Sequence, residues 1–174
     1  MAGFVERMVG AATLDVRIYE EVEHDQNATG QAAGVVALVA IAAAIGSYGM
    51  GGIYGAIGSI VAAFVGWVIW SAVTLVIGTK IFDGTADMGE MLRTLGFAQA
   101  VGVIKVLGII PLLGWIASIA AGIWMLVCGV VAVRQALDFT TGKAIGTVVL
   151  GWLAMFLLTV MIGGIMAGLG AFAG

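Results

Sequence analysis

Between Asp25 and Lys80 the chain runs for 54 residues without a formal charge. A membrane-spanning helix needs about 20 predominantly apolar residues, so this stretch is long enough for two. Five glycines from Gly46 to Gly55 supply a turn signal in its interior. We therefore predict one span near residues 31–48 and a second near 53–78, joined by a short reversal.

The composition agrees with a membrane protein. Of 174 residues, 62% are hydrophobic and 10% are charged, and the mean hydropathy is +1.17. Soluble domains are about half apolar and a quarter charged. The formal net charge of -3 and the single cysteine argue against a nucleic-acid-binding protein and a disulfide-stabilised scaffold. We expect membrane lipids as the surroundings and no nucleic acid as a partner.

The rest of the chain predicts three more spans. From Thr94 to Val133 the only charge is Lys105, and Pro111 lies between Gly108 and Gly114. Proline beside glycine marks a hairpin, which gives spans near 91–109 and 113–134. The last 31 residues carry no charged side chain, so a fifth, tilted span is predicted near 144–172. The predicted fold class is all-α, an integral membrane bundle of five transmembrane helices preceded by an N-terminal amphipathic helix.

That N-terminal helix lies within residues 1–30, which we predict to be a cytoplasmic segment ahead of the membrane domain at 31–174. Leu14, Ile18 and Val22 follow a spacing of four residues, the pattern of an amphipathic helix. Its apolar stripe either lies flat on the bilayer or packs under the bundle, and the sequence leaves both open. No cleavable signal is expected, because thirty polar or mixed residues precede the first span.

The distribution of cations predicts the orientation. The N-terminal segment and the two loops on its side of the membrane carry Arg7, Arg17, Lys80, Arg93, Arg134 and Lys143. The opposite loops, near 49–52 and 110–112, carry no lysine or arginine. The positive-inside rule therefore places the N-terminus in the cytoplasm and the C-terminus outside.

The side chains that membrane enzymes and pumps need are scarce. One histidine, His24, and one cysteine, Cys128, cannot build a zinc, haem or iron–sulfur site in a single chain. Every carboxylate side chain is predicted to lie in the N-terminal segment or a cytoplasmic loop, so no proton relay is expected at depth. We expect no catalytic residues, no cofactor and no metal site.

Lys105 and Gln99 are the polar residues to follow in the third span. A cation at the centre of a membrane helix costs about 2.5–3.5 kcal/mol or more. Lys105 lies near the outer hairpin, so its long stem could snorkel to the external interface. The alternatives are an ion pair with the C-terminal carboxylate of Gly174, with a lipid phosphate or with an acidic group of a partner subunit.

Small residues recur at intervals of four in three of the spans. Such stripes let helix backbones approach each other in lipid, and they serve folding within one chain and assembly between chains equally well. The predicted helix-packing residues are Gly58, Ala62 and Gly66 in the second span, Gly114, Ser118 and Gly122 in the fourth, and Gly164 and Gly168 in the fifth.

Several segments outside the generic apolar runs resemble one known family. They are Tyr19-Glu-Glu-Val-Glu-His-Asp25, Gly89-Glu-Met-Leu-Arg-Thr-Leu-Gly-Phe-Ala98, Pro111-Leu-Leu-Gly-Trp115, Ile123-Trp124 and Gln135-Ala-Leu-Asp-Phe-Thr-Thr-Gly-Lys-Ala144. Together they resemble the bacterial branch of the Yip family, five-span proteins named for Ypt/Rab interaction, and the likeness covers the chain from residue 14 onward.

The resemblance implies a protein without catalytic activity in a bacterial plasma membrane. Eukaryotic members bind small GTPases and shape or sort Golgi and ER membranes. Their Tyr-Asp-Leu-Tyr-Gly-Pro type motif is absent here, which argues against binding of a Rab-type GTPase.

Two functional hypotheses follow from the sequence. The leading one is a non-enzymatic membrane protein that works by helix–helix association with itself or with other subunits, as a membrane organiser or an accessory subunit of a larger complex. The alternative is a small-solute or ion transporter that uses Lys105 and Gln99 as its polar groups.

Overall fold

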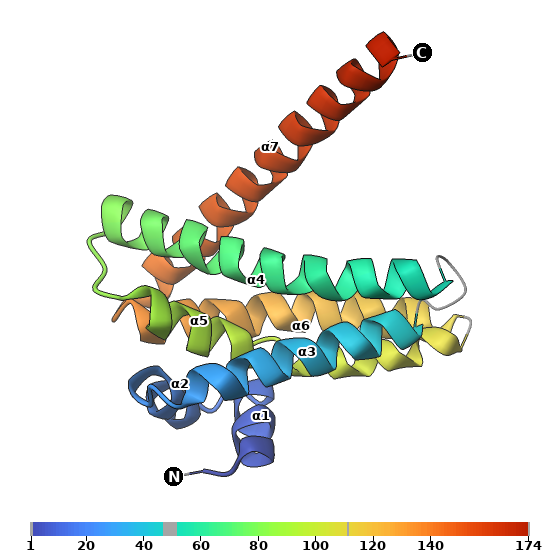
Figure 1. The fold of residues 1–174 in the computed structure, drawn as a ribbon. Helices are drawn as coiled ribbons and strands as arrows, with labels where there is room; N and C mark the ends of the chain where they lie inside the picture. The colour runs from blue at the N-terminus through green and yellow to red at the C-terminus, as the bar shows by residue number, and fades with distance from the viewer. Residues whose placement is uncertain (1, 47–51, 111, 174) are drawn as a thin grey trace.

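The structure is a computed structural model that describes residues 2–46, 52–110 and 112–173, with side chains described up to Gly164. Helices account for most of these ranges, and no strand occurs in them, so the predicted all-α class is confirmed. The elements are α1 (Phe4–Ala12), α2 (Val16–His24), α3 (Ala28–Gly46), α4 (Gly52–Ile81), α5 (Met88–Phe97), the 3-10 helix η2 (Ala100–Ile109), α6 (Leu113–Ala136) and α7 (Thr141–Ala173) (Figure 1).

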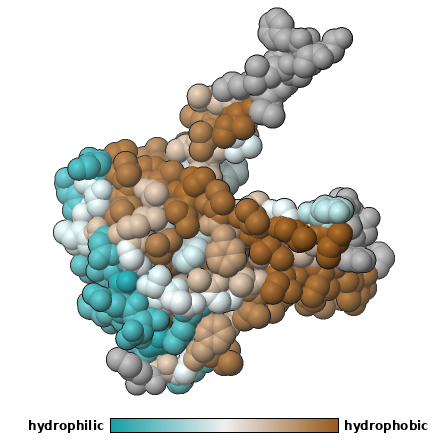
Figure 2. Space-filling view, viewed as in Figure 1, coloured by the Kyte–Doolittle hydropathy of each residue, from teal (hydrophilic) through white to brown (hydrophobic). Residues whose placement is uncertain are grey.

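Four helices, α3, α4, α6 and α7, are long and apolar enough to cross a membrane. Apolar residues cover the length of the bundle, and polar residues gather at one end of it (Figure 2). The predicted span near 91–109 is not one straight helix. Instead, α5 and η2 meet at a bend of 41°, and together they make a fifth candidate span.

The bent pair of α5 and η2 runs alongside α3 and so crosses the bundle from one end to the other. A Cβ atom placed on Gly96 would lie 2.7 Å from the Cβ of Ala32, near the start of α3. At the other end, a Cβ on Gly108 would lie 2.6 Å from the carbonyl oxygen of Gly46, the last residue of α3. The pair therefore spans the full length of α3, as Figure 1 shows.

The reversals at the far end of the bundle fall where the glycines predicted them. α3 ends at Gly46 and α4 begins at Gly52, while the intervening residues 47–51 lie outside the described ranges. In the second hairpin, Leu112 takes a left-handed φ of 68° and the Gly114 amide donates to the Ile110 carbonyl at 2.8 Å. Pro111 itself lies outside the described residues.

The N-terminal segment forms two helices where the sequence suggested one. Leu14 has a left-handed φ of 63° and lies between α1 and α2, so it is not part of the predicted stripe. The break is stabilised by Asp15, whose carboxylate caps α2 by accepting from the Arg17 amide at 3.0 Å. Ile18 and Val22 of the predicted stripe are buried, because α2 packs against α5 and α6. The apolar stripe of α2 therefore packs under the bundle and does not lie flat on the bilayer.

Only the first part of α7 packs against other helices of the chain. At Gly151 the helix approaches Trp70 and Thr74 of α4. From Trp152 to Gly164 every residue except Met155 is exposed, and Figure 1 shows the helix leaving the bundle. The distal half of α7 therefore makes no packing contact with the described part of the chain and is free to contact other molecules.

Candidate functional site

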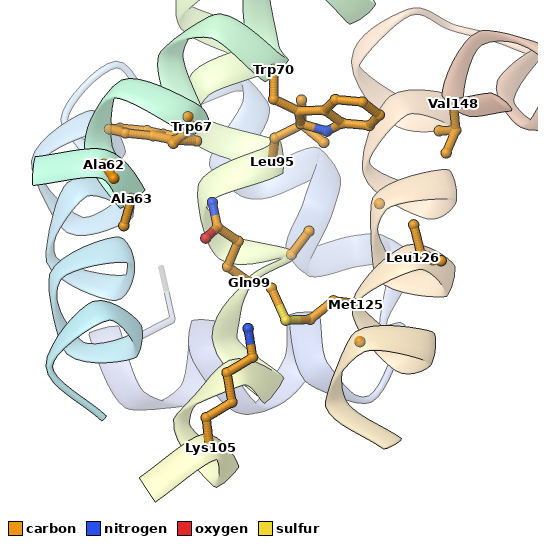
Figure 3. Close-up of a pocket in the computed structure, with 14 residues that line it drawn as sticks. Ala62, Ala63, Trp67, Trp70, Leu95, Gln99, Lys105, Met125, Leu126 and Val148 are labelled. Carbon is orange, nitrogen blue, oxygen red and sulfur yellow. The ribbon is translucent and has the colours of Figure 1, made fainter. Parts of the chain in front are cut away.

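A cavity of about 370 Å³ opens between α4 and α6 and is floored by α5 and η2. We call it the lateral cavity. Its apolar walls come mainly from α4 and α6, which are far apart in sequence and lie on either side of the segment that joins α5 to η2 (Figure 3). The lining residues are Ala62, Ala63, Gly66, Trp67, Trp70, Leu95, Ala98, Gln99, Lys105, Gly122, Met125, Leu126, Gly129 and Val148.

The structure brings the two polar residues singled out in the sequence into this one cavity. Gln99 is the N-cap of η2, and Lys105 lies in the middle of η2, six residues further along. A 3-10 helix has about three residues per turn, so positions six apart share a face. The same spacing on an α-helix would point the two side chains in different directions.

Lys105 does not snorkel towards the outer hairpin. Its side chain extends from η2 into the lateral cavity, towards Gln99 (Figure 3). Among the described residues neither side chain has a hydrogen-bond or ion-pair partner, and the described ion pairs belong to Arg7 and Arg17. The predicted pairing with the carboxylate of Gly174 lies outside the described residues.

Two tryptophans form a rigid wall opposite these polar groups. The Trp67 indole nitrogen donates to the Leu92 carbonyl at 3.1 Å, which fixes its ring between α4 and α5. Trp70 packs against Gly151 of α7. Glycines widen the space between the walls, since a Cβ atom on Gly66, Gly122 or Gly129 would meet no described atom within 4 Å. The cavity is thus apolar along its walls and polar at its floor.

The predicted packing stripes lie in different surroundings. Gly114 is buried, and a Cβ atom on it would clash with the Gly108 backbone and lie 2.9 Å from the Leu107 carbonyl oxygen. Ser118 is exposed on α6 and Ala62 on α4. Gly58, Gly66, Gly122 and Gly164 would accept a Cβ atom without a described contact within 4 Å. The surroundings of Gly168 lie outside the described side chains.

A second glycine spacing packs the bent span. Gly96, Gly102 and Gly108 recur every six residues and approach Ala32, Val39 and Gly46 of α3, which recur every seven. Gly102 and Gly108 lie in η2, where six residues make two turns of a 3-10 helix, whereas Gly96 lies in α5 before the bend. In α3, seven residues make about two turns of an α-helix. These glycines are six residues apart in the sequence, so the four-residue spacing that is typical of packed α-helices does not identify them.

At the polar end, two arginines attach the N-terminal helices to the bundle. Arg7 is 1% exposed and donates to Glu21 at 2.7 Å, Asp25 at 2.8 Å and Gln31 at 3.0 Å. Burial lowers the pKa of Arg7, but the hydrogen bonds that Arg7 donates to the Glu21 and Asp25 carboxylates outweigh it and raise the pKa. Arg93 donates to the carbonyl oxygens of Val22 and Glu23 at the end of α2, the negative end of the helix dipole.

Glu23 makes the stability of this end depend on pH. It is 7% exposed, and burial raises its pKa to about 7. Because the folded state then holds a proton that the unfolded state releases near pH 4.5, stability is expected to fall as pH rises from about 4.5 to about 7. Glu23→Gln is expected to flatten this part of the profile, measured as melting temperature of the full-length protein in detergent.

Glu20→Gln is the matched control for that prediction, since it lies on the same helix and keeps an acceptor for Gln135. It is expected to retain the wild-type slope. The pKa of His24 is raised by the hydrogen bond to the Glu20 carbonyl and by the Glu23 charge. His24 therefore adds a slope of the same sign in both variants, and this slope is smaller in Glu23→Gln. Equal slopes in the wild-type and Glu23→Gln proteins would contradict the assignment to Glu23.

Comparison with known proteins agrees with these features. A family model, the Yip1 domain, matches residues 17–170. No curated protein and no solved structure matches the chain at a significant level. The matched range begins in α2 and ends in α7, so it includes every candidate span and the lateral cavity. The chain, an all-helical protein with membrane-spanning helices, therefore belongs to the Yip1 domain family.

Proposed function

We propose that this protein acts without catalysis, by association of its helices within the membrane, as a membrane organiser or an accessory subunit of a larger complex. The observation that carries the proposal is the distal part of α7. Leu157 and Met161 there are 61% and 62% exposed, and the helix continues to Ala173 beyond any described contact with the bundle.

Small residues on this part of α7 favour a helix over lipid as its neighbour. Lipid tails are as apolar as leucine, so burial of apolar area gives helices no reason to associate in a membrane. A small-residue face does, because it lets two backbones approach closely. Gly164 and Gly168 are four residues apart, and Gly164 has open space beside it. The partner is a membrane helix of a second copy or of another subunit.

Cysteine crosslinking in native membranes tests this association. In a Cys128→Ala background, Leu157→Cys is expected to give a crosslinked adduct whose mass shows whether the partner is a second copy. Val76→Cys is the control, because Val76 is 57% exposed on α4 and is expected to remain uncrosslinked. Adding Gly164→Leu is expected to remove the Leu157→Cys adduct. Absence of any adduct, together with only monomer after purification in a gentle detergent, would contradict the proposal.

We further propose that the chain lies in a bacterial plasma membrane with its N-terminus in the cytoplasm and its C-terminus outside. Two contacts support this orientation by joining cationic segments at one end of the bundle. Lys143 donates to the Phe82 carbonyl at 2.8 Å, and Arg93 donates to the Glu23 carbonyl at 2.9 Å. In intact cells an impermeant reagent is expected to label a C-terminal tag and spare an N-terminal one, whereas equal labelling of both tags would contradict the orientation.

A further inference from the structure

We propose that the lateral cavity binds an anionic membrane lipid, with the Lys105 ammonium as the partner of the lipid headgroup. This inference stands apart from helix association, because it concerns the space between α4 and α6 and not the distal part of α7. It begins from a cation that extends into a cavity among membrane-spanning helices (Figure 3). A charge in that setting is costly unless it is paired.

The chain supplies no anion to Lys105 within its described residues. None of the described carboxylates lies within ion-pair distance of the ammonium, since the described ion pairs join Arg7 to Glu21 and Asp25, and Arg17 to Asp15. The other carboxylates lie on α1, α2 and α5 or in the segments that follow α4 and α6. Because no carboxylate of the described residues is available to Lys105, we assign this anion to another molecule.

A second polar side chain on the cavity floor favours an oxygen-rich anion. The Gln99 amide lines the same floor as the ammonium and donates to no residue in the described part of the chain, and the Trp70 indole lines the opposite wall without a described acceptor. An ammonium with neighbouring N–H donors suits phosphate or carboxylate oxygens, because charge-assisted hydrogen bonds are about twice as strong as neutral ones. The lateral cavity thus offers a polar floor to a headgroup.

The walls and the volume favour a lipid over a helix or a free ion. A volume of about 370 Å³ falls in the range of about 300–1,000 Å³ that small-molecule sites occupy, whereas an α-helix is about 10 Å wide. Beyond Lys105 and Gln99 the lining is apolar, including Trp67, Leu126 and Val148. Leu126 lines the cavity and is 49% exposed, so the cavity is open to the surface on this side. An acyl chain bound in the cavity would reach the bilayer through this opening.

Fluorescence of the two cavity tryptophans tests the proposal directly. In the full-length protein with Trp115, Trp124 and Trp152 changed to phenylalanine, the remaining emission comes from Trp67 and Trp70. Vesicles containing phosphatidylglycerol with brominated acyl chains are expected to quench this emission at lower lipid fraction than vesicles with brominated phosphatidylcholine. Lys105→Met is expected to weaken the preference for the anionic lipid by about tenfold, the effect of losing one charge-assisted hydrogen bond.

Matched variants separate the cavity from the rest of the protein. Lys80→Met makes the same change at an exposed lysine of α4 and is expected to keep the wild-type preference. Gly122→Leu is expected to fill the cavity and reduce quenching by both lipids, while Gly58→Leu, which lies outside the lining, is expected to leave it unchanged.

Three results would overturn the proposal. One is an equal preference for the two lipids in the wild-type protein, and another is a preference that Lys105→Met leaves unchanged. The third is relief of quenching by millimolar inorganic phosphate as complete as that by unbrominated phosphatidylglycerol, which would assign the site to a free anion. Failure of the Leu157→Cys crosslink would leave all three measurements unaffected, so this proposal and the association proposal fail independently.

Discussion

Replacing Arg7 with methionine is expected to lower the free energy of unfolding by about 3 kcal/mol, the lower end of the cost of removing one partner of a buried ion pair, because the Glu21 side chain is 29% exposed. Methionine fills a similar volume, so the change isolates the guanidinium. Arg7 joins three helices through Glu21 and Asp25 of the α2 region and Gln31 of α3. Without it the Asp25 carboxylate, whose side chain is 9% exposed, faces Glu21 with no cation between them.

Reversible unfolding of the detergent-solubilised protein measures this loss. Arg17→Met is the control, because the Arg17 side chain is 88% exposed in its ion pair with Asp15. Exposed pairs contribute about 0–1 kcal/mol, so this variant is expected to unfold close to the wild-type protein. The hydrogen bonds from Arg7 hold the pKa values of Glu21 and Asp25 low, and in Arg7→Met both are expected to rise. Equal stability of the two variants would contradict the structural role of Arg7.

Gly114→Ala is expected to destabilise the second hairpin by about 3 kcal/mol, at the upper end of what overpacking costs. The added methyl group would meet the backbone of Gly108 and the carbonyl oxygen of Leu107. Backbone atoms on both sides leave no flexible side chain to move away. Unfolding measurements on the same detergent-solubilised protein report the loss.

Gly122→Ala is the matched control, since it makes the same change eight residues further along α6, where a Cβ atom meets no described atom within 4 Å. Alanine is a better helix former than glycine by about 1 kcal/mol, so this variant is expected to be as stable as the wild-type protein or more so. If the Gly114→Ala and Gly122→Ala proteins had the same free energy of unfolding, this result would contradict the close approach of α6 to η2 at Gly114.

The sequence singled out several of the site residues, but it did not predict what those residues contact. Gly114 was predicted to pack by its spacing from Ser118 and Gly122, but the contact of Gly114 is with Gly108 on the same hairpin. Lys105 and Gln99 were recognised because a polar side chain in an apolar run is unusual in any fold. Their common cavity was not predicted, because it depends on the 3-10 geometry of η2.

That geometry follows from contacts with α3. The backbone of the bent span packs against α3 at three glycines, where Gly96, Gly102 and Gly108 meet Ala32, Val39 and Gly46. Neither local sequence predicts which segment it will contact. The same holds for Leu14, which continues an α-helical interval of four in the sequence but takes a left-handed φ of 63° between α1 and α2. There the buried contacts of Ile18, Tyr19 and Val22 position α2 under the bundle.

The sequence by itself determined the membrane class, the all-α fold and the approximate limits of the long helices. The bilayer requires each spanning segment to satisfy its own backbone hydrogen bonds and to be apolar over about 20 residues, and both are local properties of the chain. Only the tertiary structure decided the bend at Gln99, the direction of the Lys105 side chain and the departure of α7 from the bundle. These depend on which side chains meet across space, and in lipid that choice rests on close packing and polar pairing between segments far apart in the sequence.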